Sequence, residues 1–140
     1  MQNKSIVLDS SVIAKFLFSE REKDLDHADR LMKDAQGGKI ILVAPFLARY
    51  EMGNVIRFRD MTPTEKAVNW DNFCLLPIRY MDTTITDGRK ALIIAETAGI
   101  TFYDAVFMAL AGRLNATLVT ANPKHQKRFP GVTVVELKEY

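Results

Sequence analysis

Short, continuously apolar runs alternate along this chain with longer segments in which apolar residues recur at helical spacing. The runs predict five β-strands, at residues 5–9, 39–44, 76–80, 116–120 and 131–137. Because these runs are apolar throughout rather than at every second position, they favour strands that are covered on both faces.

The segments between the runs predict helices. They lie at residues 11–18, 24–36, 45 to about 60, 62 to about 74, about 86–99 and about 103–114, and a short one can begin at Asn122. Gly37 and Gly38 end the second helix, and Pro45 opens the third. A capping box, Thr62-Pro63-Thr64-Glu65, starts the fourth. Strands that alternate with helices in this way indicate an α/β fold with a mostly parallel sheet.

Composition narrows the class of protein without deciding its function. The 140 residues suit one domain spanning 1–140, and 48% hydrophobic and 26% charged residues are ordinary for a soluble protein. Cys74 is the only cysteine, which excludes an internal disulfide, and no Cys/His cluster offers a zinc site. Without a signal-peptide pattern or an apolar run of about 20 residues, we expect a cytoplasmic protein with no membrane partner. The net charge of +2 leaves nucleic-acid binding open.

Four polar residues lie where a parallel sheet places its site. Ligands bind beyond the carboxyl ends of such strands, and Asp9 ends the first predicted strand while Asn122 follows the fourth. Glu51 lies early in the helix after the second strand, and Asp104 lies in the first turn of a very apolar helix. That helix must be largely buried, and a carboxylate in it needs a partner because an isolated buried charge is costly.

Each acid also has a simpler interpretation. Asp9 can cap the helix that begins near Ser11, Asp104 can cap or stabilise its own helix start, and Glu51 can lie on a solvated face. Asp82 and Asp87, which flank a predicted helix start, are most simply caps as well, although either could lie near the metal pocket. Taken together, however, three carboxylates at one rim repel one another unless a cation binds, and Mg²⁺ or Mn²⁺ suits a set of oxygen ligands. The pattern favours metal-assisted hydrolysis of a phosphodiester.

At these positions the sequence resembles the PIN-domain family, and within it the VapC-like toxins of prokaryotic toxin–antitoxin modules. The resemblance covers nearly the whole chain. It rests on four segments, Ile6-Val7-Leu8-Asp9-Ser10-Ser11-Val12, Tyr50-Glu51-Met52-Gly53-Asn54-Val55, Thr101-Phe102-Tyr103-Asp104-Ala105 and Leu118-Val119-Thr120-Ala121-Asn122. The third segment is the most specific.

The resemblance implies a three-layer α/β/α sandwich and an endoribonuclease that depends on Mg²⁺ or Mn²⁺. It also implies an RNA substrate, a cognate antitoxin and a homodimer or higher homo-oligomer. By position, Asp9, Glu51 and Asp104 would be metal ligands, and Thr120 would support the site or contact a phosphate. Asn122 stands where the family usually has a fourth acid. The loss of one negative charge predicts weaker binding of a second metal and reduced or Mn²⁺-biased activity, although the amide oxygen can still bind metal or orient a water.

Two further questions stay open. The basic run at residues 124–128 follows Asn122, so Lys124 and Arg128 can hold RNA phosphates, but such a run is usually a solvated face. With Asn122 in place, the domain can also be a weakly active or inactive scaffold that binds RNA or a partner protein. Affinity for Mn²⁺ through Asp9 and Asp104 discriminates the enzyme from the scaffold.

Other α/β families fit less well. A receiver domain needs a neighbouring acidic pair in its first loop, and a haloacid-dehalogenase phosphatase needs Asp-x-Asp, whereas Asp9 is followed by Ser10 and Ser11. No Gly-rich phosphate loop is present, which argues against nucleotide binding of the Walker or Rossmann type.

Overall fold

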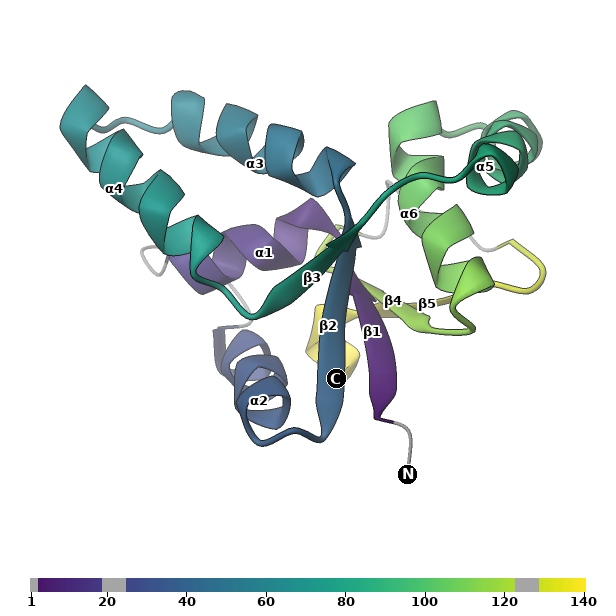
Figure 1. Cartoon of the computed structure of the whole chain (residues 1–140), viewed down its shortest axis with the longest axis horizontal. Helices are drawn as coiled ribbons and strands as arrows, with labels where there is room; N and C mark the ends of the chain where they lie inside the picture. Colours follow the sequence, from purple (N-terminus) through teal and green to yellow (C-terminus); the bar gives the residue numbers. More distant parts are fainter. Residues whose placement is uncertain (1–2, 19–24, 123–128) are drawn as a thin grey trace.

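The computed structural model describes residues 3–18, 25–122 and 129–140. Within these residues the chain forms a five-stranded sheet of order β3-β2-β1-β4-β5, in which every pairing is parallel (Figure 1). The strands are β1 (Lys4–Leu8), β2 (Ile40–Pro45), β3 (Ile78–Met81), β4 (Thr117–Thr120) and β5 (Thr133–Glu136). The helices are α1 (Ser10–Leu17), α2 (Leu25–Gln36), α3 (Leu47–Arg57), α4 (Pro63–Cys74), α5 (Ile85–Ala98), α6 (Phe102–Arg113) and a final 3-10 turn, η1 (Leu137–Glu139).

Helices cover both faces of the sheet. On one face α6 contacts β1, β2 and β4, and α5 packs against α6. On the other face α1 contacts β4, α2 and α3 contact β2, and α4 packs outside α1 and α3 (Figure 1). The arrangement confirms the three-layer α/β/α sandwich.

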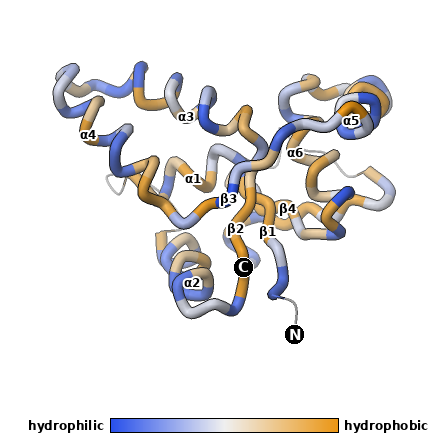
Figure 2. The backbone as a smooth tube through the Cα atoms, viewed as in Figure 1, coloured by the Kyte–Doolittle hydropathy of each residue, from blue (hydrophilic) through white to orange (hydrophobic). Residues whose placement is uncertain are grey.

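The core lies between the central strands and α6. Ile6, Val7 and Leu8 of β1 are at most 1% exposed, and residues 105–111 of α6 are all buried. Figure 2 shows the central strands as largely hydrophobic along their length. Burial on both faces therefore explains why the strand runs are continuously apolar. Among the described residues no single helix is long and apolar enough to span a bilayer, and α5 and α6 pass that test only as a pair bent by 119°.

Local capping sets several helix boundaries. Thr62 and Glu65 form the predicted capping box at the start of α4, with the Thr62 N–H donating to Glu65 Oε2 at 2.8 Å. Gly99 ends α5 in the left-handed conformation, with φ of 66°, which glycine adopts without a steric penalty. Both signals act within one or two turns, so they are readable from sequence.

The prediction at Pro45 was wrong. Pro45 does not open a helix; it ends β2 in register with Met81, and α3 starts at Leu47. The Phe46 N–H donates to the Met81 carbonyl at 3.0 Å, so the missing N–H of Pro45 would have faced β1. The pairing of β1 with β2 already ends at Val43, and the proline therefore disrupts no ladder bond.

Most other boundaries shift by one to three residues from the sequence prediction. The last strand is shorter than residues 131–137, because Leu137 begins η1. The short helix predicted to begin at Asn122 runs into residues 123–128, which lie outside the described part of the chain.

Candidate active site

The edge of the sheet beyond the carboxyl ends of β1 and β4, where Asp9 lies, is the topological switch point of the fold. From β1 the chain crosses to β2 on one side, whereas β4 flanks β1 on the other side. Asp9 follows β1 directly, and its N–H extends the ladder by donating to the Val119 carbonyl at 3.0 Å. Crevices at such switch points, beyond the carboxyl ends of the strands, are where open α/β sheets bind ligands.

One pocket collects the three predicted acids. Its cavity volume is about 450 Å³, and we refer to it as the acidic pocket. It is lined by Asp9, Ser10, Ser11, Ala14, Glu51, Asn54, Val55, Phe58 and Asp104. The acids arrive from the end of β1, from α3 and from α6, which are far apart in sequence, so the fold alone brings them together.

Two hydroxyl groups hold the carboxylate of Asp9. Thr120 Oγ1 donates to Asp9 Oδ2 at 3.0 Å, and Ser11 Oγ donates to the same oxygen. Each hydroxyl is fixed in turn by a backbone N–H at 3.0 Å, that of Asn122 for Thr120 and that of Ala121 for Ser11. Asp9 occupies the N-cap position of α1 but makes no side-chain cap hydrogen bond, so the simple capping interpretation was wrong.

Glu51 lies on the face of α3 that lines the acidic pocket. Glu51, Asn54, Val55 and Phe58 are spaced i, i+3, i+4 and i+7, which places them on one helical stripe. Ser10 Oγ donates to Glu51 Oε1 at 2.9 Å. Glu51 is half-buried and bonded across the pocket, so it is not a residue of a solvated face.

Asp104 enters the pocket from the first turn of α6. The helix is capped by Thr101, whose hydroxyl accepts from the Asp104 N–H at 3.1 Å. Asp104 is therefore not the cap, because Thr101 fills that position, and of the simpler interpretation only stabilisation of the helix start remains. The start of a helix carries partial positive charge, which favours a carboxylate there.

The donor chemistry of the acidic pocket fits a hard divalent cation. Three carboxylates and the Asn54 amide present oxygen donors, and no histidine or cysteine is among the described residues that line the pocket. Such sets select Mg²⁺ or Mn²⁺ over softer metals. Within the described part of the chain, no three His, Cys, Asp or Glu side chains are already grouped as a metal centre.

Thr120 and Asn122, the remaining predicted site residues that the structure describes, are not among the residues that line the acidic pocket. Thr120 is fully buried and bonds to Asp9, so in this structure it supports an acid and is not exposed to a phosphate. Asn122 is half-buried, and its N–H donates to Thr120. Lys124 and Arg128 lie outside the described residues.

Ser10, Ser11 and Asn54 line the pocket although none was assigned a role from the sequence. Two signals for them were present: the serines directly follow Asp9, and Asn54 comes one helical turn after Glu51. Neither signal distinguishes a site residue from an ordinary surface residue until the opposing element is known.

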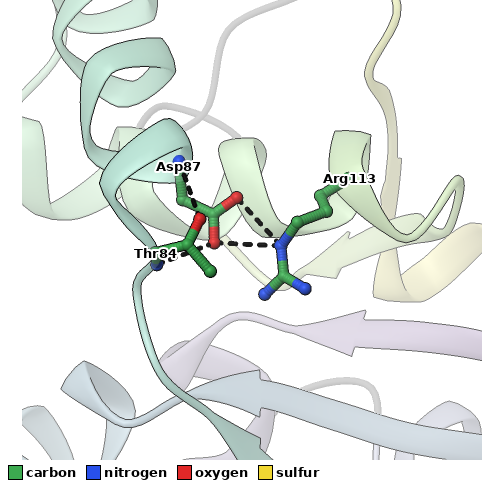
Figure 3. A network of polar contacts seen from close by, with 3 residues as sticks. All are labelled: Thr84, Asp87 and Arg113. Atoms are coloured by element: carbon green, nitrogen blue, oxygen red, sulfur yellow. Dashed lines mark hydrogen bonds and ion pairs between the residues drawn. The ribbon is translucent and has the colours of Figure 1, made fainter.

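Asp87 belongs to a separate network. Its carboxylate accepts from the Thr84 N–H at 3.1 Å and from Arg113 Nε at 2.9 and 3.0 Å, joining the start of α5 to the end of α6 (Figure 3). Thr84 Oγ1 accepts from the Asp87 N–H at 3.0 Å, which completes a capping box. The prediction of a cap is confirmed for Asp87 and wrong for Asp82, because Thr84 is the N-cap.

The amino-acid sequence of this chain is similar to those of known proteins. The family model of the PIN domain matches residues 6–131, a span that contains all three acids and Asn122. The chain belongs to the PIN-domain family. This PIN domain is 27% identical to ribonuclease VapC3 of Pyrobaculum aerophilum over 135 residues, covering 91% of this chain and 96% of that protein.

Solved structures share the fold. VapBC2 of Rickettsia felis, bound to a promoter DNA fragment, matches with a TM-score of 0.74 at 16% identity, covering 94% of this chain and 98% of that chain. DNA-bound VapBC of Salmonella typhimurium matches with a TM-score of 0.72 at 14% identity, covering 97% and 99%. The resemblance of the sequence to VapC-like PIN domains is confirmed.

Proposed function

We propose that this PIN domain is a metal-dependent endoribonuclease and the toxin of a toxin–antitoxin pair. The observation that carries the proposal is the convergence of Asp9, Glu51 and Asp104 on one pocket at the switch point of a parallel sheet. The name of the relative VapC3, a ribonuclease similar over nearly its whole length, supports the same activity.

In this proposal Asp9, Glu51 and Asp104 hold Mg²⁺ or Mn²⁺. When bound, the cation supplies Lewis-acid polarisation of the phosphodiester and an activated water for its hydrolysis. The residues of the chain orient the ligands: Thr120 and Ser11 fix the Asp9 carboxylate through hydrogen bonds to Oδ2. Such partners behind a metal ligand commonly change metal affinity or activity by about 10- to 100-fold.

The decisive experiment compares cleavage of single-stranded and structured RNA by wild type and Asp104→Asn, each with Mg²⁺, Mn²⁺ or EDTA. We expect metal-dependent cleavage by wild type that Asp104→Asn loses, because the substitution removes one of the three charges that attract the cation. Equal behaviour of the two proteins under every metal would exclude catalysis through this pocket on these substrates.

A second candidate function is a weakly active or inactive PIN scaffold that binds RNA or a partner protein. Asn122 favours it, since an amide replaces the usual fourth acid. Titration with Mn²⁺ separates the candidates, because the enzyme binds Mn²⁺ through Asp9 and Asp104 and a scaffold need not. If the enzyme is weakened only by charge, Asn122→Asp will raise Mn²⁺ affinity and cleavage rate together.

An antitoxin protein is the proposed regulator. The related solved structures are VapBC complexes, and this PIN domain covers 98% or more of the matched chain in two of them. Co-expression with the product of a neighbouring short reading frame, followed by affinity purification, tests the pairing. The expectation that the protein acts in the cytoplasm stays a prediction.

We propose a homodimer formed through α5. Ile85, Leu92 and Ile93 are 80%, 58% and 60% exposed, an unusual load of exposed aliphatic surface for one helix. Arg89 and Glu96 are exposed on the same side of the helix. Antiparallel pairing of two α5 helices about a point between Leu92 and Ile93 places Arg89 of each copy opposite Glu96 of the other, as an isologous interface requires.

The charge pattern makes the dimer testable by exchange. We expect Arg89→Glu to shift the mass measured by light scattering from dimer to monomer, because it places like charges opposite each other. The double variant Arg89→Glu/Glu96→Arg restores opposite charges and should restore the dimer. A monomeric wild type, or a dimer that ignores both variants, excludes this interface.

A further inference from the structure

A cluster of aromatic rings lies where α3 and α4 meet β3. Phe46 and Tyr80 have ring centroids 6.2 Å apart, Phe73 lies 6.1 Å from Tyr80, and Trp70 lies 5.4 Å from Phe73. Phe73 is fully buried, and Phe46 and Trp70 are partly exposed. The fully buried ring of Phe73 and the half-buried ring of Tyr80 therefore form the base against which the partly exposed rings pack.

These exposed rings border a second pocket. Phe46, Arg49, Tyr50 and Trp70 line a cavity of about 340 Å³, which we call the aromatic pocket. The Arg49 guanidinium carbon lies 5.9 Å from the Phe46 centroid and 5.5 Å from the Tyr80 centroid, so two rings position its charge. Among the ion pairs between described residues, none includes Arg49. The pocket combines flat apolar faces with a cation that is available to an anion.

The aromatic pocket adjoins the acidic pocket along α3. Tyr50 directly precedes Glu51 and lies one turn before Asn54, both of which line the acidic pocket. The Cβ atoms of residues at i and i+4 on a helix are only about 5–6 Å apart. Beyond Asn54, Phe58 also lines the acidic pocket, with the Arg57 guanidinium 5.2 Å from its ring centroid. Along the chain, an arginine–aromatic pair therefore comes before Glu51 and another comes after it.

We propose that the aromatic pocket binds an unpaired nucleobase of the RNA beside the bond that is cut, with Arg49 on a neighbouring phosphate. This inference rests on the proposed ribonuclease function. Base stacking on aromatic side chains together with a basic contact to the backbone is how proteins hold single strands without reading their sequence. Tyr50, 78% exposed, offers its ring face at low conformational cost.

The position of the pocket restricts the substrate. A base held in a duplex cannot enter a side pocket unless it unpairs, which costs energy. The aromatic pocket therefore selects loops, bulges and single strands, and it fixes the register of the strand relative to the acids. Arg49 acts as a general phosphate contact and Tyr50 as the stacking surface.

Trp70 makes the inference directly measurable. It is the only tryptophan in the chain and it lines the aromatic pocket, so its fluorescence reports on that pocket alone. We would titrate the whole protein in EDTA, where no metal-dependent cleavage occurs, with a single-stranded RNA hexamer and with an abasic strand of equal charge. We expect the hexamer to quench Trp70 fluorescence and the abasic strand to have little effect.

Three variants sharpen the test. Tyr50→Ala should weaken binding of the hexamer by about tenfold, as the loss of one stacked base does. Tyr50→Phe is the matched control, because it keeps the ring and should keep the affinity. Arg49→Gln should lower the slope of log Kd against log salt by about 0.7, the value for one phosphate contact on a single strand. Because Tyr50 is largely exposed, we expect both Tyr50 variants to unfold at the wild-type temperature.

The outcomes separate this inference from the proposed function. Metal-dependent RNA cleavage without base-dependent quenching leaves the nuclease standing and overturns the base pocket. Quenching without cleavage under any metal overturns the nuclease and retains the base pocket as a binding feature. A Trp70 signal that follows protein concentration and ignores RNA would assign the pocket to contact between copies and overturn the inference.

Discussion

Thr120→Val tests whether a buried hydroxyl holds the first acid in place. The substitution keeps the shape of the side chain and removes one oxygen. In the wild type that oxygen donates to Asp9 Oδ2 at 3.0 Å and accepts from the Asn122 N–H at 3.0 Å, and Thr120 is 0% exposed. No water can replace a hydroxyl at a fully buried position without a rearrangement of the packing.

The magnitude follows from these two bonds. A hydrogen bond to a charged group contributes about 1.5–3 kcal/mol, and a half-buried N–H left unpaired adds at most about 1 kcal/mol. Asp9 keeps the bond from Ser11, so we expect the free energy of unfolding to fall by about 2–3 kcal/mol. Unfolding 140 residues at about 2.1 cal/mol/K per residue makes this a fall in Tm of about 7–10 °C.

The assay is thermal unfolding in EDTA followed by circular dichroism, with Mn²⁺ affinity measured by calorimetry. We expect Mn²⁺ to bind about 10- to 100-fold more weakly to Thr120→Val, because the carboxylate of Asp9 is less well oriented. Thr117→Val is the matched control: it makes the same change on the same strand, at the opposite end from Asp9. A Thr120→Val protein that unfolds within about 2 °C of wild type would refute the reasoning.

Three other perturbations test separate features of the structure. Arg113→Ala leaves the buried carboxylate of Asp87 without its cation, and it should lower the free energy of unfolding by about 2–3 kcal/mol in denaturant titrations. This loss is smaller than usual for a buried pair because Arg113 is 32% exposed. Tyr80→Phe removes a buried hydroxyl that has no hydrogen-bond partner among the described residues, so stability should stay equal or rise by about 1 kcal/mol. Burial raises the pKa of Tyr80 from 10.0 to about 12, opposed by Arg49. The protonated form is thus favoured in the fold, so the stability of wild type should fall as the pH rises from 10.0 to about 12. The stability of Tyr80→Phe should fall less over the same range. Mn²⁺ at about 100 times its Kd should raise the free energy of unfolding of wild type by about 2.7 kcal/mol, and EDTA should reverse the effect. The stability of the double variant Asp9→Asn/Asp104→Asn should not change. An equal shift in both proteins would place the metal elsewhere.

Much of the fold was readable because its signals are local. A strand or a helix reveals itself through the period of its apolar residues, and a cap through a pair of residues three positions apart, such as Thr62 and Glu65. Apart from the short helix predicted at Asn122, which runs into residues outside the described part of the chain, the predicted helices and strands are present for this reason. Pro45 was misread because its role depends on where β1 stops pairing, and no residue near Pro45 reports that.

The residues of the candidate site also fall into those that the sequence alone pointed to and those that it did not. Asp9 and Asp104 were identified because a carboxylate at the end of an apolar strand, or inside an apolar helix, is out of place in its own neighbourhood. Thr120 was assigned a supporting role only through the family resemblance, and Ser10 and Ser11 were assigned none. Thr120 bonds to Asp9 across 111 positions of sequence, and Ser10 bonds to Glu51 across 41.

The sequence by itself therefore determined the α/β class, the positions of the elements and the family, since each depends on residue order over short spans. The tertiary structure decided the strand order, the gathering of three acids in one pocket and the aromatic pocket beside it. The physical reason is that burial and hydrogen bonding act between surfaces, and which surfaces meet is settled only when the sheet and its two helical layers pack together.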